Sequence, residues 1–298
     1  MTIEISVGGG QLVGSRELQE DAYLIKLPRG ANAAVGPTLL IVADGIGGQY
    51  GGDIASQLAV KLFAAEIANQ LKPPMQRNSK DTAPKILGPA SIAPLDANSN
   101  TPAVLLQALN RANKQLATAK ARNPELALMG STFVAALIYA DQLWWISVGD
   151  SHLYLARKRR LAHKNVSHTY GAFLDDEAFL GNVVEQATPR ERKRLTSSMD
   201  GAEIPRVDCP QMPLQLELGD VVILASDGLD ALSEGRIVFI VDAANSAEEC
   251  ATALLSAVNQ VAHPRQDNTT VVVYRYGSAP VQRSAAVEID FDFTKTIQ

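Results

Sequence analysis

The stretch LLIVADGIGGQYGGDIAS, residues 39–56, is the part of the sequence on which the fold prediction depends. An apolar run ends at Asp44, several glycines follow, and apolar residues then recur at helical spacing from Ile54. This pattern predicts a buried strand, a tight polar loop and the start of a helix. A carboxylate at a strand end, beside glycine backbone, suits a metal ion or a phosphate. Taken alone, the stretch does not exclude an ordinary turn in which Asp44 is a local cap.

The composition is typical of a globular protein that does not bind nucleic acid. The 298 residues allow one large domain or two ordinary ones, and 46% of them are hydrophobic. The net charge of −5 gives no support to a nucleic-acid partner. The start of the chain does not resemble a signal peptide, and no apolar run approaches the roughly 20 residues that span a bilayer. With only Cys209 and Cys250, far apart, we expect free thiols, no membrane contact and a cytoplasmic location.

Apolar periodicity predicts the main helices and strands. The expected helices span 52–71, 103–121 and 247–261, and the expected strands span 3–6, 11–14, 23–27, 39–44, 130–138, 143–148, 152–156, 221–225 and 271–274. Three glycines at 8–10 are expected to turn the first two strands into a hairpin. Short turns separate the three strands between 130 and 156, which predicts an antiparallel meander.

Two segments differ from the rest in composition. Residues 73–102 are rich in proline and small polar residues, and we expect an exposed insertion or mobile loop within a single domain that spans residues 1–277. Residues 278–298 form a tail in which VEIDFDF alternates apolar and acidic side chains. This alternation predicts an extra edge strand that packs its apolar face on the domain.

Two polar clusters are expected to be surface features. His163 and His168 lie five residues apart in a loop-like segment, which is a poor pattern for a metal site. A basic cluster consists of Arg190, Arg192, Lys193 and Arg194. A solvated helix face is the favoured interpretation of this cluster, and guidance of an anionic substrate is the alternative.

Four aspartates lie at the ends of predicted strands. Asp44 follows LLIVA, Asp150 follows WWISVG, Asp227 follows VVILAS, and Asp267 precedes the last strand. In an antiparallel sheet, the exits of some strands and the entries of others lie at one edge, so the four carboxylates are expected to converge. Each aspartate alone fits a common turn, and the inference depends on their joint pattern.

Converging carboxylates require cations. Two of them about 4 Å apart repel by roughly 4 kcal/mol at an effective dielectric of about 20. A donor set made only of oxygen favours Mg²⁺ or Mn²⁺ over Zn²⁺ or Cu²⁺. Acids shared between two such ions, roughly 3.5–4 Å apart, make a site that activates water and holds a phosphoryl oxygen. Arg16 is the candidate phosphate ligand, because a guanidinium binds phosphate with two hydrogen bonds.

With these features the chain resembles the metal-dependent serine/threonine protein phosphatases of the type 2C (PPM) family, in their bacterial form. Six family elements occur in family order, at GSRELQEDA (14–22), DGIGGQYGGDIAS (44–56), GST (130–132), GDSH (149–152), SDGL (226–229) and DNTT (267–270). The resemblance implies an α+β fold, a four-layer α-β-β-α sandwich in which two antiparallel sheets lie between pairs of helices. It also implies that residues 1–277 are the catalytic domain.

The resemblance implies two bound Mg²⁺ or Mn²⁺ ions and a weaker third. The implied metal ligands are Asp44 as the bridge, the Gly45 carbonyl, Glu20 through water, Asp227 with Asp267 at the second ion, and Asp150 with Asp227 at the third. Arg16 would bind the substrate phosphate. Asp21 would orient the first motif, and Asn268 would support Asp267.

The implied reaction is the hydrolysis of phosphoserine and phosphothreonine in proteins, in which a metal-bridged hydroxide attacks phosphorus directly. Three positions depart from the family pattern. Gln19 replaces Asn, His152 replaces Arg with little expected effect on the chemistry, and Ile46 stands where many eukaryotic members carry a histidine suggested as general acid. Protonation of the leaving group would therefore come from water.

Two alternative functions stay open. One is a pseudophosphatase that acts as a regulatory binding module, and the other is a phosphatase of a small phosphorylated metabolite. For the favoured function, the expected partners are phosphorylated proteins, the substrates of a serine/threonine kinase. We expect a monomer that binds neither nucleic acid nor a membrane.

Overall fold

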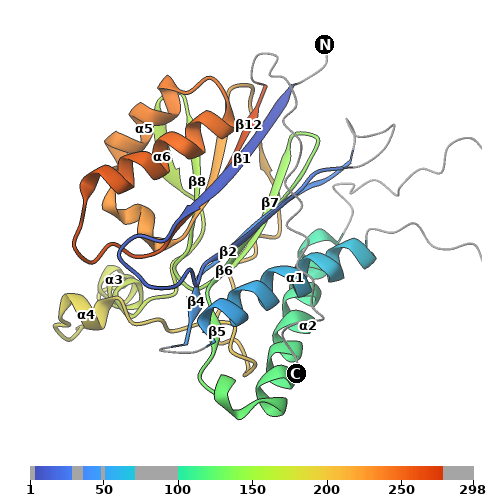
Figure 1. The fold of residues 1–298 in the computed structure, drawn as a ribbon, viewed down its shortest axis with the longest axis vertical. Helices are drawn as coiled ribbons and strands as arrows, with labels where there is room; N and C mark the ends of the chain where they lie inside the picture. The colour runs from blue at the N-terminus through green and yellow to red at the C-terminus, as the bar shows by residue number, and fades with distance from the viewer. Residues whose placement is uncertain (1–3, 29–35, 48–50, 71–99, 278–298) are drawn as a thin grey trace, which may run out of the picture.

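The protein folds as a sandwich of two antiparallel sheets between two pairs of helices (Figure 1). The computed structural model describes residues 4–28, 36–47, 51–70 and 100–277. One five-stranded sheet has the order β1-β12-β11-β8-β9, and the other has the order β10-β7-β6-β3-β2. Helices α1 and α2 pack on the second sheet, and α5 and α6 pack on the first. The predicted four-layer α-β-β-α architecture is confirmed.

The bounds of the elements are as follows. The first sheet contains β1 (Ile5–Leu12), β12 (Thr269–Tyr276), β11 (Val221–Ala225), β8 (His152–Arg157) and β9 (Arg160–His163). The second contains β10 (Leu214–Gln215), β7 (Gln142–Val148), β6 (Phe133–Tyr139), β3 (Thr38–Ala43) and β2 (Ala22–Lys26), and a small ribbon joins β4 (Gly45–Ile46) to β5 (Gly130–Ser131). The helices are α1 (Gly52–Gln70), α2 (Thr101–Arg122), α3 (Tyr170–Phe179), α4 (Pro189–Arg192), α5 (Glu234–Ala243) and α6 (Ala247–Val261), with short 3₁₀ turns η1 (Pro124–Leu126) and η2 (Asp227–Ala231).

The central strands are apolar on both faces because each lies between two layers. In β3, Leu39 and Ile41 pack towards α1 and α2, whereas Leu40 and Val42 pack between the sheets. Such burial on both faces explains why the sequence there is a continuous apolar run and does not alternate.

The predicted hairpin at residues 3–14 is wrong. β1 runs without a break through the three glycines and pairs with β12, with Gly8 opposite Val273 and Gly10 opposite Val271. A side chain at Gly8 would overlap the backbone of Glu248 near the start of α6. This glycine therefore allows a helix to approach the strand closely, instead of turning the chain.

The predicted three-stranded meander is only partly right. β6 and β7 pair as expected, but β8 belongs to the other sheet, where it pairs with β11. Gly149, with a φ of +96°, lies in the connection that carries the chain from one sheet to the other. Because this connection between the sheets is as short as a hairpin turn, its sequence resembles that of a hairpin turn.

The remaining predictions on the fold have mixed outcomes. All three predicted helices are present, and α6 has the predicted bounds. Pro102 lies in the first turn of α2, so the predicted insertion does not extend to that residue. Residues 71–99 and the tail 278–298 lie outside the described residues. None of the described helices combines the length and the apolar character needed to cross a membrane.

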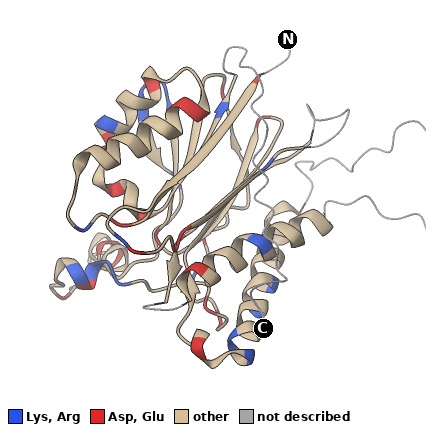
Figure 2. Cartoon of the chain, in the orientation of Figure 1, with Lys and Arg blue, Asp and Glu red and all other residues tan. Residues whose placement is uncertain are grey.

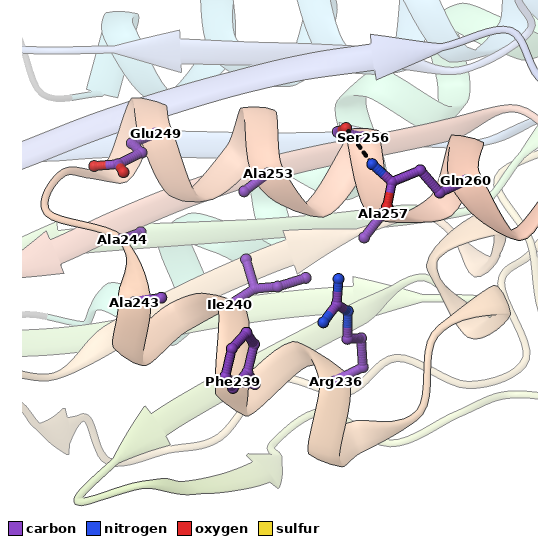
Figure 3. Close-up of a pocket in the computed structure, with 10 residues that line it drawn as sticks. All are labelled: Arg236, Phe239, Ile240, Ala243, Ala244, Glu249, Ala253, Ser256, Ala257 and Gln260. Atoms are coloured by element: carbon purple, nitrogen blue, oxygen red, sulfur yellow. Dashed lines mark hydrogen bonds between the residues drawn. The ribbon is translucent and has the colours of Figure 1, made fainter.

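A groove of about 280 Å³ lies between α5 and α6 (Figure 3). Its walls include Arg236 and Phe239 from α5 and Ser256 and Gln260 from α6. None of the lining residues belongs to the predicted site, so this groove is not where the acidic residues meet.

The contact at Gly8 generates a prediction. Gly8→Ala should lower the free energy of unfolding by about 3 kcal/mol, because the new methyl group overlaps helix backbone that cannot turn aside. Gly9→Ala is the matched control. Its methyl group would meet the Ile25 and Tyr23 side chains at 3.1 Å and the Val271 carbonyl at 3.2 Å, with no overlap below 3 Å, and should cost about 1 kcal/mol. Urea denaturation measures both, and equal midpoints would contradict this account of β1.

Candidate active site

The predicted acidic residues meet at one end of the sandwich. β3, β7 and β11 end there and β12 begins there, with Ala225 of β11 opposite both His152 of β8 and Val271 of β12. Figure 2 shows acidic residues on the loops at this end, with basic residues on the neighbouring α4. Burial raises the pKa of Asp44 well above its usual value, and the charges of four other aspartates, Asp21, Asp227, Asp150 and Asp267, raise it further.

The neighbouring carboxyl groups respond in the same way. Burial, followed by the charge of Asp227, raises the pKa of Asp150 to about 6. Burial raises the pKa of Asp21 to about 6, although hydrogen bonds from two hydroxyls oppose the shift. Burial and then Asp267 raise the pKa of Asp227, and burial raises the pKa of Glu20. Each carboxylate is therefore costly to ionise while its neighbours are ionised.

Hydroxyl groups fix the backbone around Asp44. The Asp44 amide donates to Thr132 Oγ1 at 3.0 Å, and the amide of Thr132 donates to the Asp44 carbonyl at 2.8 Å. The Thr132 hydroxyl also contacts Ser151 Oγ at 2.7 Å, in the loop that carries Asp150. Thr132 thus couples two acidic loops. The sequence motif contained it, but nothing in its spacing indicated this role.

Two glycines make room for Glu20. The Gly45 amide donates to the Glu20 carbonyl at 3.1 Å, and a side chain at Gly45 would overlap the Gly52 carbonyl. A side chain at Gly52 would in turn overlap the Glu20 carboxylate. Glu20 therefore lies against the first residue of α1, where the helix dipole favours a negative charge.

The first motif is held by Asp21 and Asn268. The Asp21 carboxylate accepts hydrogen bonds from Ser226 Oγ and Thr270 Oγ1, both at 2.7 Å. The Asn268 side-chain amide donates to the carbonyls of Val13 and Leu18, and its oxygen accepts from the Glu20 amide at 2.8 Å. Gln19, the departure from the family pattern, accepts from the Asp21 amide at 3.1 Å and closes the turn.

Arg16 lies at the exposed rim of the site. Its guanidinium donates to Asp267 Oδ2 at 2.6 Å, and 54% of its side chain is exposed. The other oxygen of this carboxylate, Asp267 Oδ1, accepts a hydrogen bond from the backbone amide of Asn268 at 2.8 Å. The sequence expectation that Arg16 lies at the same edge as the acids is thus matched by its placement.

The donor set fits hard divalent cations. Within the described part of the chain, Asp21 Oδ1 and Asp227 Oδ1 are buried oxygens without a hydrogen-bond partner. Buried carboxylate oxygens that lack donors and that repel one another are stabilised by positive charge. In the same described residues, no three or more Asp, Glu, His or Cys side chains already surround one point. Cation binding must therefore draw these carboxylates closer together.

One residue of the basic cluster reaches the acids. Lys193 Nζ lies 4.0 Å from Asp227 Oδ2, with 72% of the lysine side chain exposed. Arg192 instead pairs with Asp175 at 2.6 Å, and Arg194 stacks on Tyr170 within the same segment. The favoured interpretation as a solvated face is therefore incomplete, because Lys193 places an exposed positive charge beside the site.

The two histidines have different environments. His163 is exposed as expected, but His168 is only 3% exposed, so its predicted surface position is wrong. His168 Nδ1 accepts a hydrogen bond from the Gly149 amide at 3.1 Å, and its own amide donates to the Gly149 carbonyl at 2.8 Å. His168 is thus a buried brace for the turn that precedes Asp150, which a loop-like sequence gives no sign of.

The sandwich fold, the convergent carboxylates and the arginine at their rim define the class of metal-dependent phosphatases. The sequence model of protein phosphatase 2C matches residues 14–260, and the chain belongs to this family.

Two proteins with sequences similar to this chain come from bacteria. The serine/threonine protein phosphatase PstP of Mycobacterium tuberculosis is 28% identical over 281 residues, which cover 92% of this chain and 48% of PstP. The serine/threonine phosphatase stp of Listeria welshimeri is 26% identical over 246 residues, which cover 79% of this chain and 83% of that protein. The chain thus spans about half the length of PstP.

A solved structure supports the same assignment. The catalytic domain of PstP, in complex with two manganese ions, superposes with a TM-score of 0.64 at 26% identity. The match covers 92% of this chain and 99% of that domain.

The crowded carboxylates predict an unusual pH dependence. The folded-state pKa of Asp21 lies above its ordinary 3.8, at about 6, so the folded state binds more protons than the unfolded state between these values. Stability without divalent cations should therefore fall as the pH rises from about 4 to about 7, by roughly 3 kcal/mol for this group. Thermal unfolding in EDTA across this range measures the slope.

Asp21→Asn should flatten that slope, whereas Asp242→Asn, on α5, should leave it unchanged. Mn²⁺ should raise the melting temperature most near pH 7, where the carboxylates are ionised. A stability that rises steadily from pH 4 to pH 7 in EDTA would contradict the shifts described above.

Proposed function

We propose that this protein is a metal-dependent protein phosphatase that hydrolyses phosphoserine and phosphothreonine. The observation that carries the proposal is the convergence of Asp44, Asp150, Asp227 and Asp267, with Arg16 at their rim, in a chain of the protein phosphatase 2C family. The names of the bacterial relatives support phosphoproteins as the substrate class.

The residues that would hold cations are those that share the crowded end of the sandwich. Asp44, the Gly45 carbonyl and Glu20 through water would serve one ion, Asp227 and Asp267 the second, and Asp150 with Asp227 a weaker third. Two bound Mg²⁺ or Mn²⁺ ions would supply an activated water for direct attack on phosphorus and would neutralise the phosphate oxygens. The two manganese ions in the PstP domain favour Mn²⁺ as the first ion to test.

The side chains of this chain would prepare the site for the reaction. If a cation bound Asp267 in place of Arg16, the planar guanidinium of Arg16 would be free to bind two phosphate oxygens. Lys193, beside Asp227, would attract the anionic substrate. Ile46 is 37% exposed, and its side chain has no ionisable group that could act as a general acid. The leaving oxygen would therefore take its proton from water.

The two alternatives predict different behaviour. A pseudophosphatase would bind phosphopeptides without turnover. The buried carboxylates with unpaired oxygens argue against this alternative, because their mutual repulsion costs stability and does not help a protein that only binds. A metabolite phosphatase would share the same acidic centre. A panel of phosphopeptides and phosphorylated metabolites separates the two enzymes by kcat/KM.

An upstream serine/threonine kinase, a monomeric state and a cytoplasmic location stay predictions.

Activity should depend on divalent cations. With Mn²⁺ the protein should hydrolyse p-nitrophenyl phosphate, and excess EDTA should abolish the release of p-nitrophenol, because the carboxylates cannot activate water alone. Absorbance at neutral pH measures this. Inactivity with both Mn²⁺ and Mg²⁺, in protein that is folded and binds phosphopeptide, would favour the pseudophosphatase.

Asp227→Asn should lower kcat by at least about 100-fold, because it removes a charge that the cations require. The melting temperature in EDTA should not fall, since the change also removes repulsion. Asp242→Asn is the matched control, because Asp242 pairs with Arg159 away from the acidic loops. Near-normal turnover by Asp227→Asn would refute the proposed site.

Arg16→Ala should raise KM for p-nitrophenyl phosphate about tenfold, which corresponds to roughly 1.4 kcal/mol of lost phosphate binding. Arg265→Ala removes the same charge from the loop before Asp267 and should leave KM within about twofold of the native value. Steady-state kinetics at saturating Mn²⁺ make the comparison. If both variants behave alike, phosphate binds elsewhere.

A further inference from the structure

A contact between side chains joins the two loops that carry Asp150 and Asp227. His152 is the first residue of β8, two residues after Asp150, and it lies opposite Ala225, two residues before Asp227. Its Nε2 lies 2.9 Å from Oδ1 of Asp230. Asp230 belongs to η2, the 3₁₀ turn that begins at Asp227. The contact therefore connects the start of one strand to the turn that follows its neighbour.

The His152 ring is also held on its other side. His152 Nδ1 lies 3.4 Å from His163 Nε2, and the two ring centroids are 5.1 Å apart. The ring of Tyr154 lies 5.2 Å from that of His152 and 5.0 Å from that of His163. The Nε2–Oδ1 contact is short but does not have hydrogen-bond geometry, so His152 meets Asp230 through one ring nitrogen and His163 through the other. Only 11% of the His152 side chain is exposed, and it makes both contacts at once.

These contacts matter because the two loops carry like charges. Asp150 and Asp227 lie close enough for each to act on the ionisation of its neighbours, and repulsion would push the loops apart. Backbone pairing ends at Ala225 and His152, so beyond this point the β-ladder no longer holds the loops together. The His152–Asp230 contact starts at the last paired residue and reaches into η2, past the end of the β8–β11 ladder.

We propose that His152 and Asp230 form a clamp, a pair of positioning residues that limits how far the Asp150 and Asp227 loops can separate, so that divalent cations can draw their carboxylates together. The inference rests on the proposed function, since it concerns the cations of the same site. It revises the expectation that His152 has little effect, because the residue acts through the placement of Asp150 and Asp227 and does not itself touch the substrate.

Calorimetric titration of the cation-free full chain with MnCl₂ tests the clamp without relying on turnover. His152→Ala and Asp230→Asn should each raise the Kd for Mn²⁺ about tenfold, the usual effect of losing a partner that orients a metal ligand. The double variant should be no worse than either single variant, since both remove one contact. His152→Arg should stay within about threefold of the native Kd, because a guanidinium is also attracted to the Asp230 carboxylate.

Asp242→Asn is the matched control. Asp242 contacts Arg159 at 2.9 Å, the same length as the clamp, but at the turn of the β8–β9 hairpin, the end away from His152. Its Kd for Mn²⁺ should equal that of the native protein. Melting temperatures in EDTA, recorded for every variant, separate a loss of folding from a loss of cation affinity. Asp230→Asn keeps the shape of the side chain and carries the test if His152→Ala does not fold.

The outcomes are distinguishable. If the native protein binds Mn²⁺ and the clamp variants bind it equally well, the clamp is overturned and the proposed function stands. A lower melting temperature with an unchanged Kd, or additive effects in the double variant, would also overturn it and leave a purely structural role. If the native protein itself does not bind Mn²⁺, the proposed function fails, and the clamp fails with it.

Discussion

Mutual repulsion among carboxylates at one end of the sandwich is the constraint on which the arrangement of the acidic loops depends. Asp21, Asp44, Asp150 and Asp227 each have a raised pKa, with burial as the leading cause and the charges of neighbouring carboxylates as a further one. The fold resists this repulsion mainly with neutral groups. Hydroxyls hold Asp44 and Asp21, an amide holds the first motif, and a buried imidazole holds the turn before Asp150. Because neutral donors do not cancel the negative charge, the site keeps its attraction for cations.

The positive side chains near the site lie at its rim and not among the acids. Arg16 and Lys193 are 54% and 72% exposed, and each touches one carboxylate from the solvent side. An exposed ion pair contributes little to stability, so both side chains can leave their carboxylate partner at small cost. They are therefore available to an incoming phosphate, in a way that a buried pair would not be.

The sequence predicted most of the site because strand ends carry it. An apolar run followed by Asp marks a position along the chain, and antiparallel pairing then brings such positions together. What the sequence could not indicate depends on contacts between distant segments. Gly8 is typical of a turn in the sequence, but in the structure it allows α6 to approach β1 closely. Gly149 is typical of a hairpin, but it lies where the chain crosses between the sheets. His168 is buried and Lys193 lies near Asp227, and the segment that carries them has no periodicity from which either position could be predicted.

The acidic residues come from both sheets, which has a mechanical consequence. Asp44 follows β3 of one sheet, whereas Asp227 and Asp267 flank β11 and β12 of the other. The apolar layer between the sheets, with residues such as Val42 and Leu224, sets the gap between these two halves together with the hydrogen bonds of Asp21. This layer is a spacer whose thickness is fixed by side-chain volume. A change of volume in the core therefore changes the width of the site, even though no residue of the core touches a phosphate.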